Sequence, residues 1–179
     1  MSKVIVLVRH ASAKESSPTQ LSASGLEMAE AIAKELTKIA PDNIFSSPTL
    51  RARRTADIIA ASLRLRVIND ARLDEREAER LGKNDFRVNW LESFDSVISR
   101  ITSFMADAPT GISVAVTHKE SIRAAIAPLM GLDDITGRGL RVDNCSLTTI
   151  ALVNDTTRIL SIGSPNLTTG LVKRIGESE

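Results

Sequence analysis

The sequence contains one cysteine, two histidines and no tyrosine. Cys145 has no second cysteine with which to form an internal disulfide, and a lone cysteine suits a reducing compartment, so we expect a cytoplasmic protein. We expect Cys145 itself to be a small buried residue within a strand. Most structural zinc sites use three or four cysteine or histidine ligands, and this composition therefore argues against one.

Long apolar runs and excess charge are also missing. The apolar run at 4–8 has five residues and stops at Arg9. It is too short for the core of a signal peptide or for a membrane span. The net charge is +1, which gives no overall field to attract nucleic acid or acidic membranes. We therefore expect neither as a partner, and any bound anion must be held by a local cluster of residues.

What the sequence does contain is a regular alternation of apolar strands and amphipathic helices without repeats or a linker. Its 179 residues suit one domain, residues 1–179, large enough to bury a core. The fold class predicted is α/β, a three-layer α/β/α sandwich with a mostly parallel central sheet. Strands are expected at 3–9, 42–45, 65–68 and 112–117, helices at about 24–39, 48–63, 90–107 and 119–130, and a hairpin at 146–153 and 158–162.

The helix starts carry recognisable capping residues. Ser24 or Ser22 can cap the first helix, and Ser47 followed by proline reads as the cap of the second. Leu26 and Leu50 fall on the faces of these helices expected to point inward. The charged stretch 70–88 shows no clear pattern and is interpreted as a loop.

Both histidines follow predicted strands. Arg9-His10 ends the first strand, and His118 ends the strand at 112–117. Parallel strands end at one edge of a sheet, where α/β proteins bind ligands near helix N-termini. Arg51 lies in the first turns of the helix that follows another strand. A single histidine at a strand end is usually structural, but two such histidines beside arginines point to a site.

The chemistry of these residues suits phosphoryl transfer. Guanidinium groups bind phosphate through paired hydrogen bonds and keep their charge. A neutral imidazole can attack phosphorus and hold the phosphoryl group covalently. Arg9, Arg51 and His118 could form a cradle around His10, with positive charge aimed at the equatorial oxygens.

A series of motifs resembles the histidine phosphatase superfamily, which includes the cofactor-dependent phosphoglycerate mutases. The motifs are Leu7-Val8-Arg9-His10, the stretches 21–25 and 46–56, Leu73-Asp74-Glu75, Val116-Thr117-His118 and Asn144-Cys145-Ser146. The resemblance implies a phosphohistidine at His10 and phosphate binding by Arg9, Arg51 and His118. It also implies that His118 takes part in catalysis, that Glu75 donates a proton, and that no metal or other cofactor is needed.

This sequence departs from the family pattern at several positions. The glycine usual after the Arg-His pair is Ala11, which with Ala13 is closer to the short phosphohistidine phosphatases. That branch generally lacks the Leu-x-Glu block that holds Glu75 here. Two glycines commonly follow the second histidine, where this chain has Lys119 and Glu120. Lys119 could bind an anionic substrate, whereas Glu120 would repel phosphate unless its side chain points away.

The resulting hypothesis is a phosphatase acting on a small phosphorylated metabolite or a phosphorylated protein side chain. Two alternatives stay open: a phosphoglycerate-mutase-like transfer, and a phosphate-binding module without turnover. Arg51 could instead be a surface residue paired with Asp57 or Glu75, and Glu75 could belong to a solvated loop. Arg53 and Arg54 are interpreted as surface charge.

Overall fold

The computed structural model describes residues 2–80, 88–154 and 156–167. Within these residues one mixed sheet has the strand order β10-β9-β1-β8-β4-β5. β1, β8, β4 and β5 run parallel, β9 is antiparallel to β1, and β10 is antiparallel to β9. These strands are β1 (Ser2–Arg9), β4 (Asn43–Ser46), β5 (Val67–Asn69), β8 (Gly111–Thr117), β9 (Leu147–Val153) and β10 (Thr156–Ser164).

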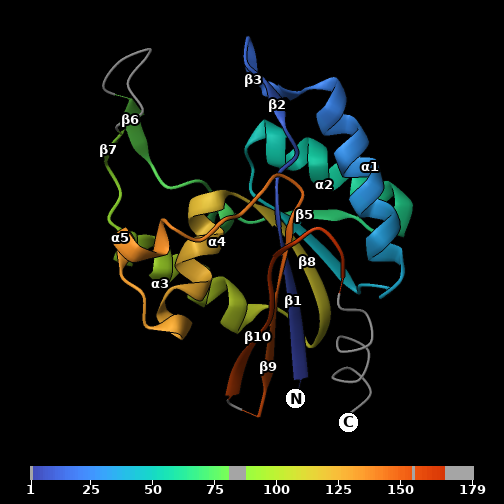
Figure 1. Cartoon of the computed structure of the whole chain (residues 1–179). Helices are drawn as coiled ribbons and strands as arrows, with labels where there is room; N and C mark the ends of the chain where they lie inside the picture. Colours follow the sequence, from blue (N-terminus) through green and yellow to red (C-terminus); the bar gives the residue numbers. More distant parts are fainter. Residues whose placement is uncertain (1, 81–87, 155, 168–179) are drawn as a thin grey trace.

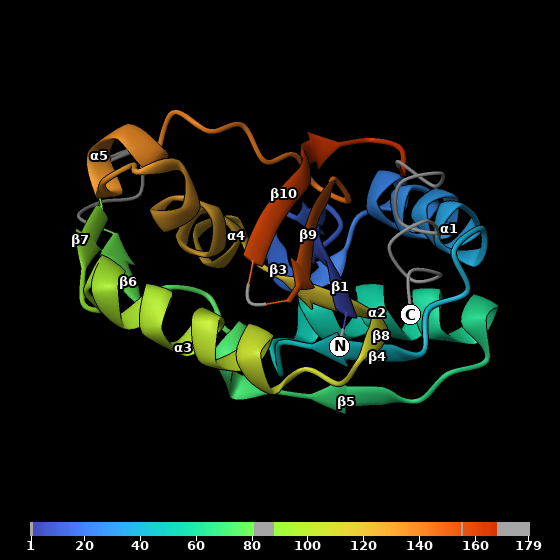
Figure 2. The same cartoon turned by 90° about the horizontal axis from the view of Figure 1, so that it is seen from below.

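Helices cover both faces of this sheet, as Figures 1 and 2 show. α1 (Ala23–Thr37) and α2 (Leu50–Leu63) lie on one face, and α3 (Phe94–Asp107) and α4 (Lys119–Ile126) lie on the other. The alternation along β1 explains why both faces are dry: Val4, Val6 and Val8 join the first core, whereas Ile5 and Leu7 join the second. The three-layer α/β/α prediction is therefore confirmed.

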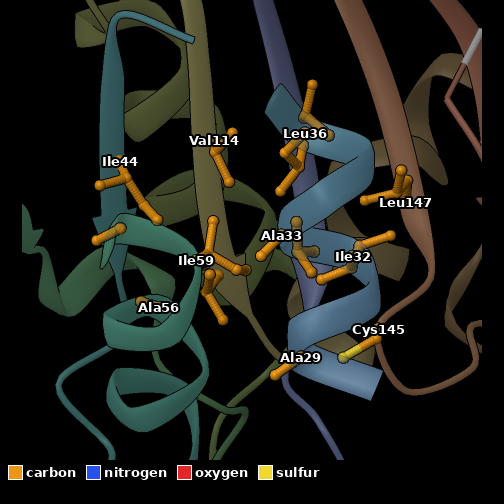
Figure 3. Packing of buried hydrophobic residues seen from close by; sticks show 14 of the residues in the cluster. Ala29, Ile32, Ala33, Leu36, Ile44, Ala56, Ile59, Val114, Cys145 and Leu147 are labelled. Carbon is orange, nitrogen blue, oxygen red and sulfur yellow. The ribbon is translucent and has the colours of Figure 1, made fainter. Parts of the chain in front are cut away.

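The first core shows how the helix periodicity meets the sheet (Figure 3). Ile32 and Leu36 are buried one turn apart on α1 and face strand residues such as Leu147. Ala29 and Ala33 lie on the same side of α1, where their small side chains leave room for the close approach of α2, whose Ala56 and Ile59 are also buried. The apolar spacing in the sequence thus determines which helix faces are buried.

Several local predictions are wrong. α1 begins at Ala23 with Ser22 as its cap, through a 3.0 Å bond from the Gly25 N–H, so Ser22 rather than Ser24 is the capping residue. α2 begins at Leu50 with Thr49 at the cap position, and Ser47 lies outside the helix. Leu26 and Leu50 are 46% and 56% exposed because they occupy first turns at the carboxyl edge, where the strands have ended.

Two stretches without a predicted helix or strand, 13–21 and 70–88, contain short elements. Residues 13–21 form a hairpin of β2 (Ala13–Lys14) and β3 (Ser17–Leu21). The 70–88 stretch contains η1 (Ala71–Leu73) and β6 (Ala78–Arg80), which pairs with β7 (Val88–Trp90); 81–87 lie outside the described residues. The sequence does not predict β2, β3, β6 and β7, because most of their described side chains are exposed and their residues show no alternation of apolar and polar side chains.

The remaining boundaries shift by a few residues. β5 begins two residues later and ends one residue later than predicted. α3 begins at Phe94 with Ser93 as its cap, and the antiparallel hairpin of β9 and β10 is confirmed. The helix predicted at 119–130 is α4 followed by η2 (Pro128–Met130), and it ends at Gly131, whose φ of 67° is the left-handed conformation that favours glycine. α5 (Asp134–Gly137) completes the described elements.

Candidate active site

The two histidines meet at the carboxyl edge of the sheet. β1 and β8 are neighbours with Arg9 opposite Thr117, so His10 and His118 each follow the matching end of a strand. The His10 N–H donates a 2.9 Å hydrogen bond to the Thr117 carbonyl oxygen. The ring centroids are 5.0 Å apart, and both side chains are buried. Strand register therefore brings together two residues more than a hundred positions apart in the sequence.

The His10 ring is held in one neutral tautomer. Its Nδ1 lies 2.9 Å from the Ala11 carbonyl oxygen, which can only accept, so Nδ1 carries the proton. The lone pair on Nε2 consequently faces the site, where Arg51 Nε donates to it over 3.2 Å. Burial, together with the charges of Arg51 and Arg9 and opposed by the hydrogen bond to Ala11, lowers the pKa of His10 to about 4. The ring is thus an uncharged potential nucleophile.

Arg51 connects three of the residues named from the sequence. Besides its contact with His10, its Nη2 donates to Glu75 Oε2 and lies 3.4 Å from Nδ1 of His118. The helix turn that carries Arg51 is fixed by Thr55, whose hydroxyl donates to the Arg51 carbonyl over 2.8 Å and accepts the Ala11 N–H over 3.0 Å. The pairing of Arg51 with Glu75 foreseen for a surface residue does occur, but inside this cluster.

Arg9 closes the other side of the cluster. Its Nη1 donates a 2.8 Å bond to the Val142 carbonyl oxygen, while its buried Nε has no partner within the part of the chain the structure describes. Burial lowers the pKa of Arg9, opposed by the negative charges of Glu75 and Asp143. An orphaned N–H of a buried guanidinium is a donor that an anion could satisfy.

The turn before β9 clamps the end of β1. Asn144 Nδ2 donates to the His10 carbonyl over 2.7 Å, and the Cys145 N–H donates to the Arg9 carbonyl over 2.9 Å. Cys145 is buried beside α1 (Figure 3), but it lies in this turn with a φ of 54°, so its predicted place within a strand is wrong. Burial raises the pKa of its thiol to about 12. Cys145 adopts this turn conformation because its N–H must reach the Arg9 carbonyl at the end of β1.

His118 has partners that the sequence did not indicate. Its Nε2 lies 3.0 Å from Ser47 Oγ and 3.1 Å from Thr49 Oγ1. Ser47 Oγ in turn donates to Asp74 Oδ1 over 2.6 Å. Burial, together with the nearby His10 and Arg51, lowers the pKa of His118 to about 2. The sequence around Ser47 predicts a helix cap, and no local pattern distinguishes that role from a contact with a distant histidine.

These positions coincide with a known family. The model of the histidine phosphatase superfamily (branch 1) matches residues 5–83 and 77–165, which include both histidines and the arginines of the cluster. The chain belongs to the histidine phosphatase superfamily. It is 30% identical to a 2,3-bisphosphoglycerate-dependent phosphoglycerate mutase of Thermoplasma acidophilum, over 96% of this chain and 97% of that protein.

Solved structures share the fold at lower identity. A variant of phosphoserine phosphatase from Entamoeba histolytica, in complex with phosphoserine, superposes with a TM-score of 0.75 at 18% identity, over 91% of this chain and 98% of that one. The mycobacterial glucosyl-3-phosphoglycerate phosphatase Rv2419c gives 0.69 at 24% identity, over 90% and 98%. Both likenesses concern the fold of a histidine phosphatase.

Glu75 lies on a segment whose backbone is held by side-chain hydrogen bonds. Thr117 Oγ1 donates to the Leu73 carbonyl and Ser121 Oγ to the Asp74 carbonyl, each over 2.6 Å. On its other side, Arg76 is buried against Trp90, with its guanidinium carbon 4.2 Å from the ring centroid. The Glu75 side chain itself is 47% exposed, at the mouth of the cluster. A proton donor for a leaving group would need this combination of fixed backbone and access.

The remaining charged candidates lie outside the cluster. Arg53 binds Asp57 over 2.9 Å, and Arg54 is exposed beside a cavity of about 540 Å³. Glu120 is buried, and its Oε1 accepts a 2.8 Å hydrogen bond from Arg123, while its Oε2 has no partner among the described residues. Among the described residues, no group of three or more histidine, cysteine or acidic side chains is placed to hold a metal ion.

Proposed function

We propose that this histidine phosphatase hydrolyses phosphomonoesters through a phosphohistidine on Nε2 of His10. Its substrate would be a small phosphorylated metabolite or a phosphorylated protein side chain. The single observation that carries this proposal is the His10 tautomer: Nδ1 is committed to the Ala11 carbonyl, and the Nε2 lone pair faces Arg51 inside a cationic cluster. A neutral, oriented imidazole beside fixed guanidinium groups is what nucleophilic attack on a phosphate needs.

The reaction would take two steps. In the first, Nε2 of His10 bonds to phosphorus as the bond from phosphorus to the leaving oxygen breaks, and Glu75 donates a proton to that oxygen. In the second, water attacks phosphorus, the bond to Nε2 breaks, and a carboxylate at Glu75 takes the proton of the water. Arg9, Arg51 and His118 would surround the equatorial oxygens, and no metal would be needed. Before this, Arg51 must exchange its contact with Glu75 for one with phosphate.

A mutase is the second candidate, favoured by the Thermoplasma relative, which matches along nearly its whole length. Because that protein extends little beyond this chain, length does not separate the two activities. Release of inorganic phosphate from a phosphoglycerate would indicate a phosphatase, whereas its conversion to the isomer without release would indicate a mutase. A module that binds phosphate without turnover would do neither.

The test is His10→Ala, with rapid acid-free quenching of the wild type during turnover. Wild-type enzyme should carry acid-labile, base-stable phosphate that maps to His10, and the variant should carry none and lose hydrolysis. Cys145→Ser is a matched control, because it is also buried next to the end of β1 but touches no reacting atom. Retention of most of the rate by His10→Ala would overturn the assignment of the nucleophile.

The location of the protein is part of the same proposal. Every helix among the described residues is too short or too polar to cross a lipid bilayer. A cytoplasmic location is supported by the single cysteine. Fractionation of cells with an antibody to the protein would test it.

A further inference from the structure

Three side chains from separate parts of the fold form a chain of hydrogen bonds that ends at His118 in the candidate active site. Asp74 follows η1, Ser47 follows β4, and His118 follows β8. We infer that Asp74, acting through Ser47, is a positioning residue that keeps a proton on Nε2 of His118 and leaves Nδ1 to meet the phosphoryl group. This inference rests on the proposed function, because it assigns a task to His118 within the same site.

The donors and acceptors leave one consistent arrangement. A hydroxyl has one hydrogen to donate, and an ionised carboxylate can only accept, so the 2.6 Å contact between Ser47 Oγ and Asp74 Oδ1 uses the hydroxyl hydrogen. Ser47 Oγ therefore presents a lone pair to His118 Nε2 at 3.0 Å. Thr49 Oγ1 lies 3.1 Å from the same Nε2 and can donate or accept, so the hydroxyl side alone does not fix the tautomer. Arg51 Nη2 decides it, because a guanidinium can only donate and lies 3.4 Å from Nδ1. Nδ1 therefore has the free lone pair, and Nε2 of the neutral ring is the donor to Ser47 Oγ.

The surroundings of Nδ1 show where that lone pair is used. Arg51 Nη2 lies 3.4 Å away and Glu75 Oε2 lies 3.8 Å away, so Nδ1 faces the cluster that would hold substrate. The cations His118 faces are Arg51, Arg9 and Arg100, and its neighbouring ring is the neutral His10. Burial, and then these cations, keep the resting ring uncharged, and Nδ1 is an acceptor until an anion arrives.

A phosphomonoester monoanion brings the missing proton. The proton on its phosphoryl oxygen passes to Nδ1, so that an O–H bond breaks and an N–H bond forms. His118 becomes an imidazolium whose Nδ1–H donates to the phosphoryl oxygen and whose Nε2–H donates to Ser47. The carboxylate of Asp74 then stabilises this cation through one intervening hydroxyl, in a buried place where charges are weakly screened.

A purely structural role would predict something else. Ser47 Oγ also accepts the Thr49 N–H over 3.2 Å, so the hydroxyl helps to shape the turn before α2. If shaping this turn were its whole task, removing the Asp74 charge would change stability and leave the tautomer of His118 as it is. The proton position and the pH dependence of turnover are therefore the readouts that separate the two roles.

The first experiment is nitrogen-15 NMR of the resting full-length protein labelled at histidine. The chain has two histidines, so only four ring nitrogens appear, and His10→Ala assigns them. In the wild type, His118 should carry its proton on Nε2. In Asp74→Asn, the amide no longer holds the Ser47 hydrogen as strongly, so Ser47 can donate to Nε2, and the proton of His118 should move to Nδ1.

The second experiment is the pH profile of kcat/KM with an aryl phosphate, whose leaving group needs no proton from Glu75. We expect Asp74→Asn to lower kcat/KM by about 10- to 100-fold. A loss of this size is typical when the residue that hydrogen-bonds a metal-bound histidine and orients its ring is mutated. The alkaline limb should move to lower pH, because the protonated ring loses its counter-charge. Glu77→Gln is the matched control: it removes the same charge three positions away on an exposed side chain and should leave the profile unchanged.

Two results would overturn the inference. One is a wild-type His118 that carries its proton on Nδ1. The other is an Asp74→Asn protein in which both the tautomer and the pH profile match the wild type. The NMR measurement needs no substrate, so it stands even if the protein proves to have no phosphatase activity. Thermal unfolding of each variant shows that the comparison is made between folded proteins.

Discussion

Nε of Arg51 lies 3.2 Å from Nε2 of His10, so the guanidinium occupies the direction from which phosphorus would approach the nucleophile. The same side chain reaches Glu75 and His118. In the absence of substrate, Arg51 thus hydrogen-bonds the side chains that would contact a bound phosphate. When the substrate binds, Arg51 must leave these partners and donate to the phosphoryl oxygens. It therefore stabilises the phosphoryl group only in the substrate complex.

Arg51→Ala should lower kcat/KM by about 100-fold, on the order of 3 kcal/mol by analogy with the loss of one oxyanion donor. Arg53→Ala is the matched control on the same helix, because Arg53 binds Asp57 and Asn69 and does not touch His10. It should change kcat/KM less than twofold, as should Arg54→Ala. Equal losses in the three variants would mean that a diffuse positive patch binds the substrate.

Glu75→Gln should act according to the leaving group. An alkoxide needs a proton as the bond to phosphorus breaks, whereas a nitrophenolate hardly does. We expect kcat to fall about 10²- to 10⁴-fold for alkyl phosphates, the usual size for a lost general acid, and to change little for p-nitrophenyl phosphate. Glu79→Gln is the control, since Glu79 lies on β6 away from Arg51. A uniform loss across both substrates would make Glu75 a binding or structural residue.

Chelation should leave the activity intact. The proposed mechanism takes its positive charge from Arg9 and Arg51, and from His118 once it holds the proton of the substrate, so dialysis against EDTA should not change kcat. Vanadate should inhibit competitively, because it would occupy the same cradle with the geometry of the transition state. Loss of activity in EDTA that a divalent ion restores would place the protein in another mechanistic class.

Stability should fall as the pH is lowered from 7 to 5. Burial keeps the pKa of His10 at about 4 and that of His118 at about 2, below the ordinary value of 6.5 that both regain on unfolding. As the pH is lowered, the histidines of the unfolded chain bind protons before those of the folded protein. The free energy of unfolding therefore falls by on the order of 1 kcal/mol per pH unit for each ring. Carboxylates contribute mainly at lower pH.

Urea denaturation at pH 7, 6 and 5 measures this dependence. His118→Gln should lose roughly half of the wild-type decrease in unfolding free energy, because one of the two rings no longer titrates. A wild-type protein whose stability is constant across this window would show that the histidines are not buried in the neutral state.

The class of fold and the position of the histidines follow from the amino-acid sequence alone. Apolar runs such as 4–8 need cover on both faces, and this need, with the intervening helices, requires a three-layer sandwich with a parallel sheet. A parallel sheet then brings the ends of its strands to one edge, which is why the order of residues along the chain is enough to place Arg9, His10 and His118 in one site.

Only the tertiary structure decided which groups fix the rings. Ser47 binds Asp74, 27 residues away, and His118, 71 residues away, and no local pattern encodes a hydrogen bond across such separations. Leu50 illustrates the same limit, because its exposure depends on where the strands end rather than on the periodicity of its helix. Side-chain periodicity reports which face of an element is buried, whereas the partner of a polar atom depends on how distant elements pack.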